Sequence, residues 1–138
     1  MSTSALPSPT PAPALALDAI GQIAIIAHDI DRAIAFYRDT LGIRFMFQAG
    51  TLAFFNCGGI RLMLTVPENA EFDYPASVLY YRVADLDAAH ETLVSRGVTF
   101  FSPPHLIHKT PAYELWMAFC RDSEGNPLAL MQEKGVVA

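Results

Sequence analysis

Two stretches of the chain carry the same order of apolar and polar positions, at residues 23–41 and 79–97. In each stretch an apolar run leads to an Asp-apolar-Asp corner, followed by apolar side chains at helical spacing and a glycine. The pattern predicts a strand and a helix in each copy. A strand–helix unit that occurs twice indicates two small modules that bury their faces against each other. We expect function in the groove between them.

In the first copy, residues 20–27 are apolar apart from Gln22 and predict a strand buried on both faces. Asp31 is expected to cap a helix that runs to Leu41, because its carboxylate can accept hydrogen bonds from the first turn. Gly42 is expected to end that helix. Three strands joined by glycine turns should follow, at residues 44–49, 51–57 and 60–66.

The second copy repeats this order after a polar linker at residues 67–76. A strand at residues 77–83 should lead into a helix capped by Asp87, and a further strand should start at residues 98–101. The remaining elements expected are a loop with Pro103, Pro104 and Pro111, a strand at 112–121, a turn at 122–126 and a strand at 127–132.

The chain is therefore predicted to have an α+β fold of two tandem βαβββ modules, at residues 19–66 and 77–134. Residues 1–18 hold prolines at positions 7, 9, 11 and 13 and no basic residue. They predict a flexible, extended Pro/Ala-rich tail, or an arm that packs on a neighbouring subunit. They lack the basic start and the continuous apolar run of a secretory signal.

Of the 138 residues 52% are apolar, and the mean hydropathy is +0.28. No run of 18 apolar residues occurs, so we predict no membrane span, and the apolar excess indicates a large core with a cavity or a subunit interface. The net charge of −5 without a Lys/Arg cluster argues against nucleic-acid and membrane partners. Cys57 and Cys120 lie in apolar runs without CxxC spacing, which favours free thiols in a reducing compartment, and we expect a cytoplasmic location.

Two further segments form recognisable motifs: residues 30–42 read IDRAIAFYRDTLG, and residues 121–130 read RDSEGNPLAL. The first resembles the D-L-x-x-A-x-x-F-Y-x-x-x-L-G opening, and the second the D-P-x-G-N-x-x-x-L hairpin, of the vicinal-oxygen-chelate superfamily. That superfamily includes glyoxalase I, extradiol dioxygenases and bleomycin-binding proteins. The resemblance implies one domain over residues 19–134, with a curved mixed sheet around a cavity, and a homodimer. It does not fix a reaction, because this superfamily hosts several.

In metal-dependent members of that superfamily, four inward-facing positions supply the ligands, and the resemblance places them at Gln22, Met63, Val78 and Ala129. Gln22 offers an amide oxygen, and Met63 offers a thioether that suits soft metals. Val78 and Ala129 have no donor atom. A catalytic divalent ion needs about three protein ligands, so we predict no metal site and no cofactor.

Strand alternation predicts which side chains share the concave face with Gln22. Arg61 and Arg82 would supply two guanidinium groups for a carboxylate or phosphate, unless their heads reach the rim and only their stems are buried. The predicted ligand-binding residues are Gln22, Arg61, Met63, Tyr80, Arg82, Trp116 and Met131.

The segment with His105, His108 and Glu114 is the second candidate for chemistry, because it belongs to a loop that the first module lacks. Burial of Glu114 would raise the pKa of its carboxyl, and a histidine could relay a proton. The alternative is that Glu114 points outward and the histidines are solvated. Three functions therefore stay open: metal-independent binding of a small organic molecule, a lyase or isomerase that uses Glu114 with His105 or His108, and a structural protein whose cavity is filled by its own side chains.

Overall fold

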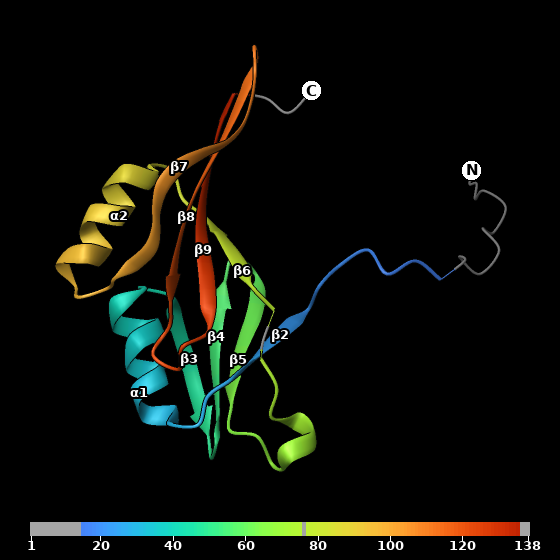
Figure 1. Cartoon of the computed structure of the whole chain (residues 1–138). Coiled ribbons are helices and arrows are strands. Elements are labelled where there is room, and N and C mark those ends of the chain that lie inside the picture. Colours follow the sequence, from blue (N-terminus) through green and yellow to red (C-terminus); the bar gives the residue numbers. More distant parts are fainter. Residues whose placement is uncertain (1–14, 76, 136–138) are drawn as a thin grey trace, which may run out of the picture.

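The computed structural model describes residues 15–75 and 77–135, which form the two modules of Figure 1, so most of the predicted tail lies outside the described residues. The first module contains β2 (Gln22–Ile26), α1 (Ile30–Ala35), the π-helical turn η1 (Phe36–Thr40), β3 (Arg44–Ala49), β4 (Leu52–Cys57) and β5 (Ile60–Thr65). A short 3-10 helix, η2 (Ala70–Phe72), lies in the linker. The second module contains β6 (Leu79–Arg82), α2 (Leu86–Ser95), β7 (Phe100–Thr110), β8 (Tyr113–Arg121) and β9 (Pro127–Gly135).

Each module has a four-stranded mixed sheet, with the strand orders β2-β5-β4-β3 and β6-β9-β8-β7. β2 is parallel to β5 and β6 is parallel to β9, while the other neighbours are antiparallel. The predicted α+β fold of two βαβββ modules is thus confirmed. In Figure 1, α1 and α2 lie on the same side of the molecule, each against the sheet of its own module. We call the opposite side of each sheet, which neither α1 nor α2 covers, its open face.

The residues that cap the two helices differ from those predicted. Asp29 has extended backbone angles and its Oδ1 accepts a hydrogen bond from the Arg32 N–H at 3.1 Å. Asp85 does the same for Ala88 at 3.0 Å. Asp31 and Asp87 were expected in this role, but each lies two residues after the actual N-cap residue, inside the first turn of its helix. Their carboxylates there still favour the positive end of the helix dipole.

The first helix does not run as a regular α-helix to Leu41. α1 ends at Ala35, and the chain continues through η1, in which the Leu41 N–H donates to the Phe36 carbonyl at 2.9 Å. This hydrogen bond spans five residues, so the turn is wider than an α-helical turn. Gly42 follows with φ +73° and ends the helix, as predicted.

The segment predicted as a proline-containing loop is part of a strand. β7 continues through Pro103 and Pro104 to Thr110, with register shifts against β8 between Phe100 and Ser102 and at two later places. Proline is tolerated here because β7 is an edge strand, whose residues can turn a missing N–H toward solvent. β7 and β8 therefore form a long hairpin that extends beyond the helices in Figure 1.

Two hydrophobic cores lie between the helices and the sheets, and they share residues. Phe55 and Leu64 are fully buried in the first core, and Leu128 and Leu130 are buried in the second. Three side chains pack against both cores: Phe36, Leu41 and Tyr81. Because the helix end at Phe36–Leu41 contributes to both, the two modules are joined through the helix-covered side.

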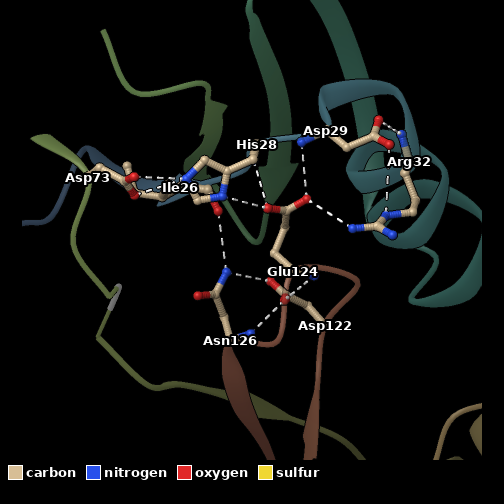
Figure 2. Close-up of polar contacts among 8 residues, drawn as sticks. All are labelled: Ile26, His28, Asp29, Arg32, Asp73, Asp122, Glu124 and Asn126. Carbon is tan, nitrogen blue, oxygen red and sulfur yellow. Dashed lines mark hydrogen bonds and ion pairs between the residues drawn. The ribbon is translucent and has the colours of Figure 1, made fainter. Parts of the chain in front are cut away.

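The β8–β9 turn makes a second connection between the modules (Figure 2). The Glu124 carboxylate accepts hydrogen bonds from the backbone N–H groups of His28 at 2.7 Å and Asp29 at 3.2 Å. Asn126 Nδ2 donates to the Ile26 carbonyl at 3.3 Å. The turn of the second module thus satisfies polar backbone groups where β2 leads into α1.

The remaining expectations from composition concern cysteines and membranes. Cys57 and Cys120 are free thiols, as predicted, and Cys120 is buried. None of the helices within the described residues is long and apolar enough to span a membrane.

Candidate functional site

The open face of the first module carries a polar pair from its two parallel strands. Gln22 of β2 lies opposite Arg61 of β5, and Arg61 Nε donates to Gln22 Oε1 at 2.9 Å. Gln22 Nε2 in turn lies 3.6 Å from the Met63 sulfur. These three predicted residues therefore do share one face. Gln22 is exposed, so β2 is buried on one face only, and the expectation of burial on both faces was wrong.

Two aromatic rings lie beside this pair. Phe47 of β3 and Phe54 of β4 stack with ring centroids 4.6 Å apart, and the Arg61 guanidinium carbon lies 5.4 Å from the Phe54 centroid. Arg61 also lines an open cavity of about 300 Å³ together with Gly21, Met46, Asn56 and Gly59. The arrangement combines a fixed guanidinium, an amide and an aromatic surface, which suits a ligand with an anionic and a planar apolar part.

Neither phenylalanine is among the residues predicted from the sequence. Alternation along β4 would have placed Phe54 on the face of Asn56, because these residues are two apart in one strand. Phe47 reaches this face through the register shift between Phe45 and Phe47, which no pattern in the sequence indicates.

The open face of the second module is mainly aromatic and contains methionine. Tyr80 of β6 packs edge-on against Phe119 of β8, with centroids 6.0 Å apart, and the predicted Met131 lies opposite Met117. Tyr80 is 50% exposed, and Phe101 is 54% exposed. In a single chain, both of these large aromatic side chains are therefore about half exposed to solvent.

Arg82 was predicted as a second free guanidinium group and is instead paired. Its Nε lies 3.3 Å from Glu133 Oε1, and the other oxygen of that carboxylate accepts a hydrogen bond from the Tyr113 hydroxyl at 2.7 Å. The hydrogen bond to Glu133 raises the pKa of Tyr113. Because Glu133 neutralises Arg82, only Arg61 of the two predicted arginines is left to pair with an anion.

Glu114 and Trp116 lie on the other side of β8. Trp116 packs against the second core, beneath α2, and its Nε1 donates to Glu114 Oε1 at 2.8 Å. Lys109 lies 3.8 Å from the same carboxylate. Gln132, which pairs with Trp116 across the sheet, reaches the N-terminus of α2 through the Leu86 N–H. Trp116 therefore lies on the face of β8 opposite to the one that Tyr80 and Met131 share with Phe119 and Met117.

The two histidines do not meet Glu114. His105 lies opposite Met117 and His108 opposite Leu115, and both of these residues alternate with Glu114 along β8. His105 Nδ1 is 2.8 Å from the Pro103 carbonyl, and its ring lies 6.5 Å from that of Phe119. The structure thus places the histidines toward the open face and Glu114 toward the helix-covered side, and it does not assemble the predicted acid–base pair.

The four positions at which metal-dependent relatives carry ligands do not form a donor set for a divalent ion. Gln22 and Met63 are in contact, but Val78 precedes β6 and Ala129 is fully buried beside Tyr80. Only the Gln22 amide oxygen is a hard donor. No cluster of three His, Cys, Asp or Glu side chains that could hold a metal ion occurs anywhere in the described part of the chain.

The predicted residues of the two modules do not line one cavity. Arg61 lines the cavity described above, whereas Arg82 borders a different one of about 390 Å³ on the helix-covered side, between α2 and Leu41–Ile43. In a single chain the predicted residues on the open faces therefore fall into two separate groups, one in each module, which we call half-sites.

Comparison with known proteins agrees with this fold. The profile of the Glyoxalase/Bleomycin resistance protein/Dioxygenase superfamily matches residues 19–130, and the chain belongs to this superfamily. It is 34% identical over 71 residues to the metallothiol transferase FosB of Staphylococcus haemolyticus, and the same holds for FosB of Staphylococcus epidermidis. The match spans 49% of this chain and about half, 51%, of those relatives.

Solved structures with the same fold include two superfamily members. A lactoylglutathione lyase from Agrobacterium tumefaciens is 26% identical with a TM-score of 0.64, over 83% of this chain and 92% of that one. A superfamily member from Sphaerobacter thermophilus is 24% identical with a TM-score of 0.70, over 84% of this chain and 98% of that one. The second likeness shows the fold alone.

Proposed function

We propose that the protein binds a small organic anion with a planar apolar part on its open face, without a catalytic divalent metal. The observation that carries the proposal is the Arg61–Gln22 hydrogen bond beside the stacked Phe47 and Phe54 rings. Gln22 occupies one N–H of the guanidinium, at Nε, and thereby orients the group. Within the described residues the terminal nitrogens of Arg61 make no hydrogen bond or ion pair, so they are available to a carboxylate.

The metal-free part of the proposal rests on the donor set. The curated relatives are metallothiol transferases, but the positions that would supply ligands here hold Gln22, Met63, Val78 and Ala129. Two of these side chains contain no donor atom, and an amide with a thioether does not suit one hard divalent ion. We therefore assign recognition of the ligand to Arg61 and the aromatic rings.

A second copy of the chain is part of the same proposal. Large apolar side chains on or near the open faces are about half exposed, among them Met46, Phe47, Tyr80 and Phe101. Apolar patches of this kind mark interaction surfaces. A homodimer that places the open face of one module opposite that of another would cover these side chains and enclose the ligand between two half-sites.

The alternative of a lyase or isomerase that uses Glu114 has no support in the geometry, because Glu114 faces away from His105 and His108. The cytoplasmic location expected from the sequence stays a prediction.

The test is a titration with benzoate, benzyl alcohol and inorganic phosphate, in which NMR chemical shifts or calorimetry measure binding. We expect benzoate to bind more tightly than benzyl alcohol, and Arg61→Gln to weaken benzoate binding about tenfold, the usual effect of losing a charge-assisted hydrogen bond. Arg38→Gln is the matched control, because it removes the same charge from a side chain that pairs with Asp39 beside the helix. Equal binding of benzoate and benzyl alcohol, or equal effects of both variants, would refute the proposal.

A further inference from the structure

His28 lies between two carboxylates from different parts of the chain (Figure 2). Its Nε2 is 3.0 Å from both oxygens of Asp73, which belongs to the linker between β5 and β6. Its Nδ1 is 3.2 Å from Glu124 Oε1, in the β8–β9 turn. One ring thus connects the corner of the first module, the linker and the turn of the second module.

This geometry favours a doubly protonated ring. A neutral imidazole has one N–H, so one of its nitrogens would present a lone pair to a carboxylate oxygen. The imidazolium form donates from both nitrogens and satisfies both contacts. In agreement, the hydrogen bond to Asp73 and the charge of Asp73 raise the pKa of His28, and Glu124 adds to the effect.

The charged groups around the ring are mostly negative, which favours a positive charge on His28. Asp29 and Arg32 belong to the same corner, and Arg32 Nη2 lies 3.5 Å from Glu124. The cluster therefore holds three carboxylates and one arginine: Arg32 contacts Asp29 and Glu124, whereas Asp73 contacts the His28 ring. The His28 side chain is 61% exposed and borders an open cavity of about 290 Å³, so water can exchange its proton.

Two kinds of contact meet here, and only one depends on the ring. Glu124 is 6% exposed and accepts backbone N–H groups of the corner whatever the protonation state of His28. In the described residues, the Asp73 side chain makes its hydrogen bonds to the His28 ring alone. Loss of the ring proton would therefore weaken the hold on the linker and leave the contact between the modules in place.

We propose that His28 is a protonation-dependent clasp, which ties the linker at Asp73 to the first module while its ring carries two protons and loosens its hold on the linker when it loses one. Along the chain, Asp73 is followed by β6, which begins at Leu79 and carries Tyr80 on the open face. The clasp thus couples pH to the order of the segment that precedes one half-site. It stands on the contacts of His28 and does not require the proposed ligand.

The sign of the pH dependence follows from the raised pKa. The clasp is closed at pH values below the ordinary histidine pKa of about 6.5. It opens as the pH rises through the higher pKa that His28 has in the folded protein. An NMR titration of the full chain from pH 5.5 to 9 tests this. We expect the amide signals of residues 70–75 to shift with the same midpoint as the His28 ring, above pH 6.5, and their hydrogen exchange to increase with pH.

Two variants and a control separate the clasp from general effects of pH. Asp73→Asn should lower the His28 midpoint toward 6.5, and His28→Gln should make residues 70–75 insensitive to pH, while unchanged α1 signals show that the fold is kept. His90→Gln is the control, because it removes a histidine from α2, away from the linker. The His90 ring centroid lies 4.5 Å from that of Phe100 in β7. The proposal would be overturned if the amide signals of residues 70–75 did not shift with the His28 titration. It would also be overturned if Asp73→Asn left the titration midpoint of His28 unchanged.

Discussion

The Tyr37 hydroxyl donates a hydrogen bond of 2.7 Å to Asp122 Oδ2, and both side chains are buried although they belong to different modules. Asp122 Oδ1 accepts backbone N–H groups of Glu124 and Asn126, so the same carboxylate also shapes the β8–β9 turn. Burial, followed by the charge of Asp122, raises the pKa of Tyr37 far above its usual range. The motif that resembles the superfamily hairpin thus has a structural role at the module junction.

Tyr37→Phe should destabilise the protein by about 1.5–3 kcal/mol, since it removes a buried hydrogen bond to a charged group. Urea unfolding measures the change, with Tyr74→Phe as the control because Tyr74 is exposed. A loss equal to that of the control would show that the donors of Glu124 and Asn126 satisfy Asp122 without Tyr37.

Stability should fall as pH rises above about 9. Burial raises the pKa of Cys120 to about 11, whereas the unfolded chain releases this proton near 9, so the folded state binds more protons across this interval. Buried Tyr81 acts in the same direction. Thermal melts from pH 7 to 11 measure the fall, and Cys120→Ala should make it shallower. An unchanged slope in that variant would contradict the assignment.

Glu114→Gln and Trp116→Phe should leave benzoate binding unchanged. Both side chains lie on the helix-covered side of β8, and Trp116→Phe should instead lower the melting temperature because it opens space beneath α2. Calorimetry of the variants beside Arg61→Gln decides the matter, and loss of binding in Glu114→Gln with an intact fold would revive the enzyme hypothesis.

The chain should be a dimer that charge on the open faces disrupts. Phe47→Asp and Tyr80→Asp each place a carboxylate on an apolar open face, so each should shift the mass measured by light scattering from two chains toward one. Val94→Asp serves as the control, because Val94 is an exposed apolar residue of α2. A wild-type chain that is monomeric at all concentrations would refute the interface.

No divalent ion should be retained in stoichiometric amount. Protein dialysed against Mn²⁺, Ni²⁺ or Zn²⁺ and then against buffer should contain well under one ion per chain, because the four ligand positions provide only one hard donor. Elemental analysis measures this. One tightly held ion per chain would show that donors other than Gln22 and Met63 form a site.

The sequence predicted the fold because the repeat and the turns are local features. Alternation also identified the open face of β5, where Arg61, Met63 and Thr65 alternate with the apolar Ile60, Leu62 and Leu64. It failed on β8, in which Leu115, Met117 and Phe119 of one face are as apolar as Trp116, Ala118 and Cys120 of the other. Only the pairing with β7 and β9 tells which side Glu114 occupies, and the register shifts of β7 cannot be read from the chain.

The wide turn of η1 has a consequence for how one helix serves two partners. A uniform α-helix keeps residues four apart on one stripe, and it could direct Tyr37 and Leu41 to one neighbour only. The added residue lets Tyr37 stay in phase with the Asp122 turn while Leu41 rotates to touch both hydrophobic interiors. Deleting one residue between them should therefore disturb one of these two contacts, while the hydrogen bonds of Glu124 and Asn126 still connect the modules.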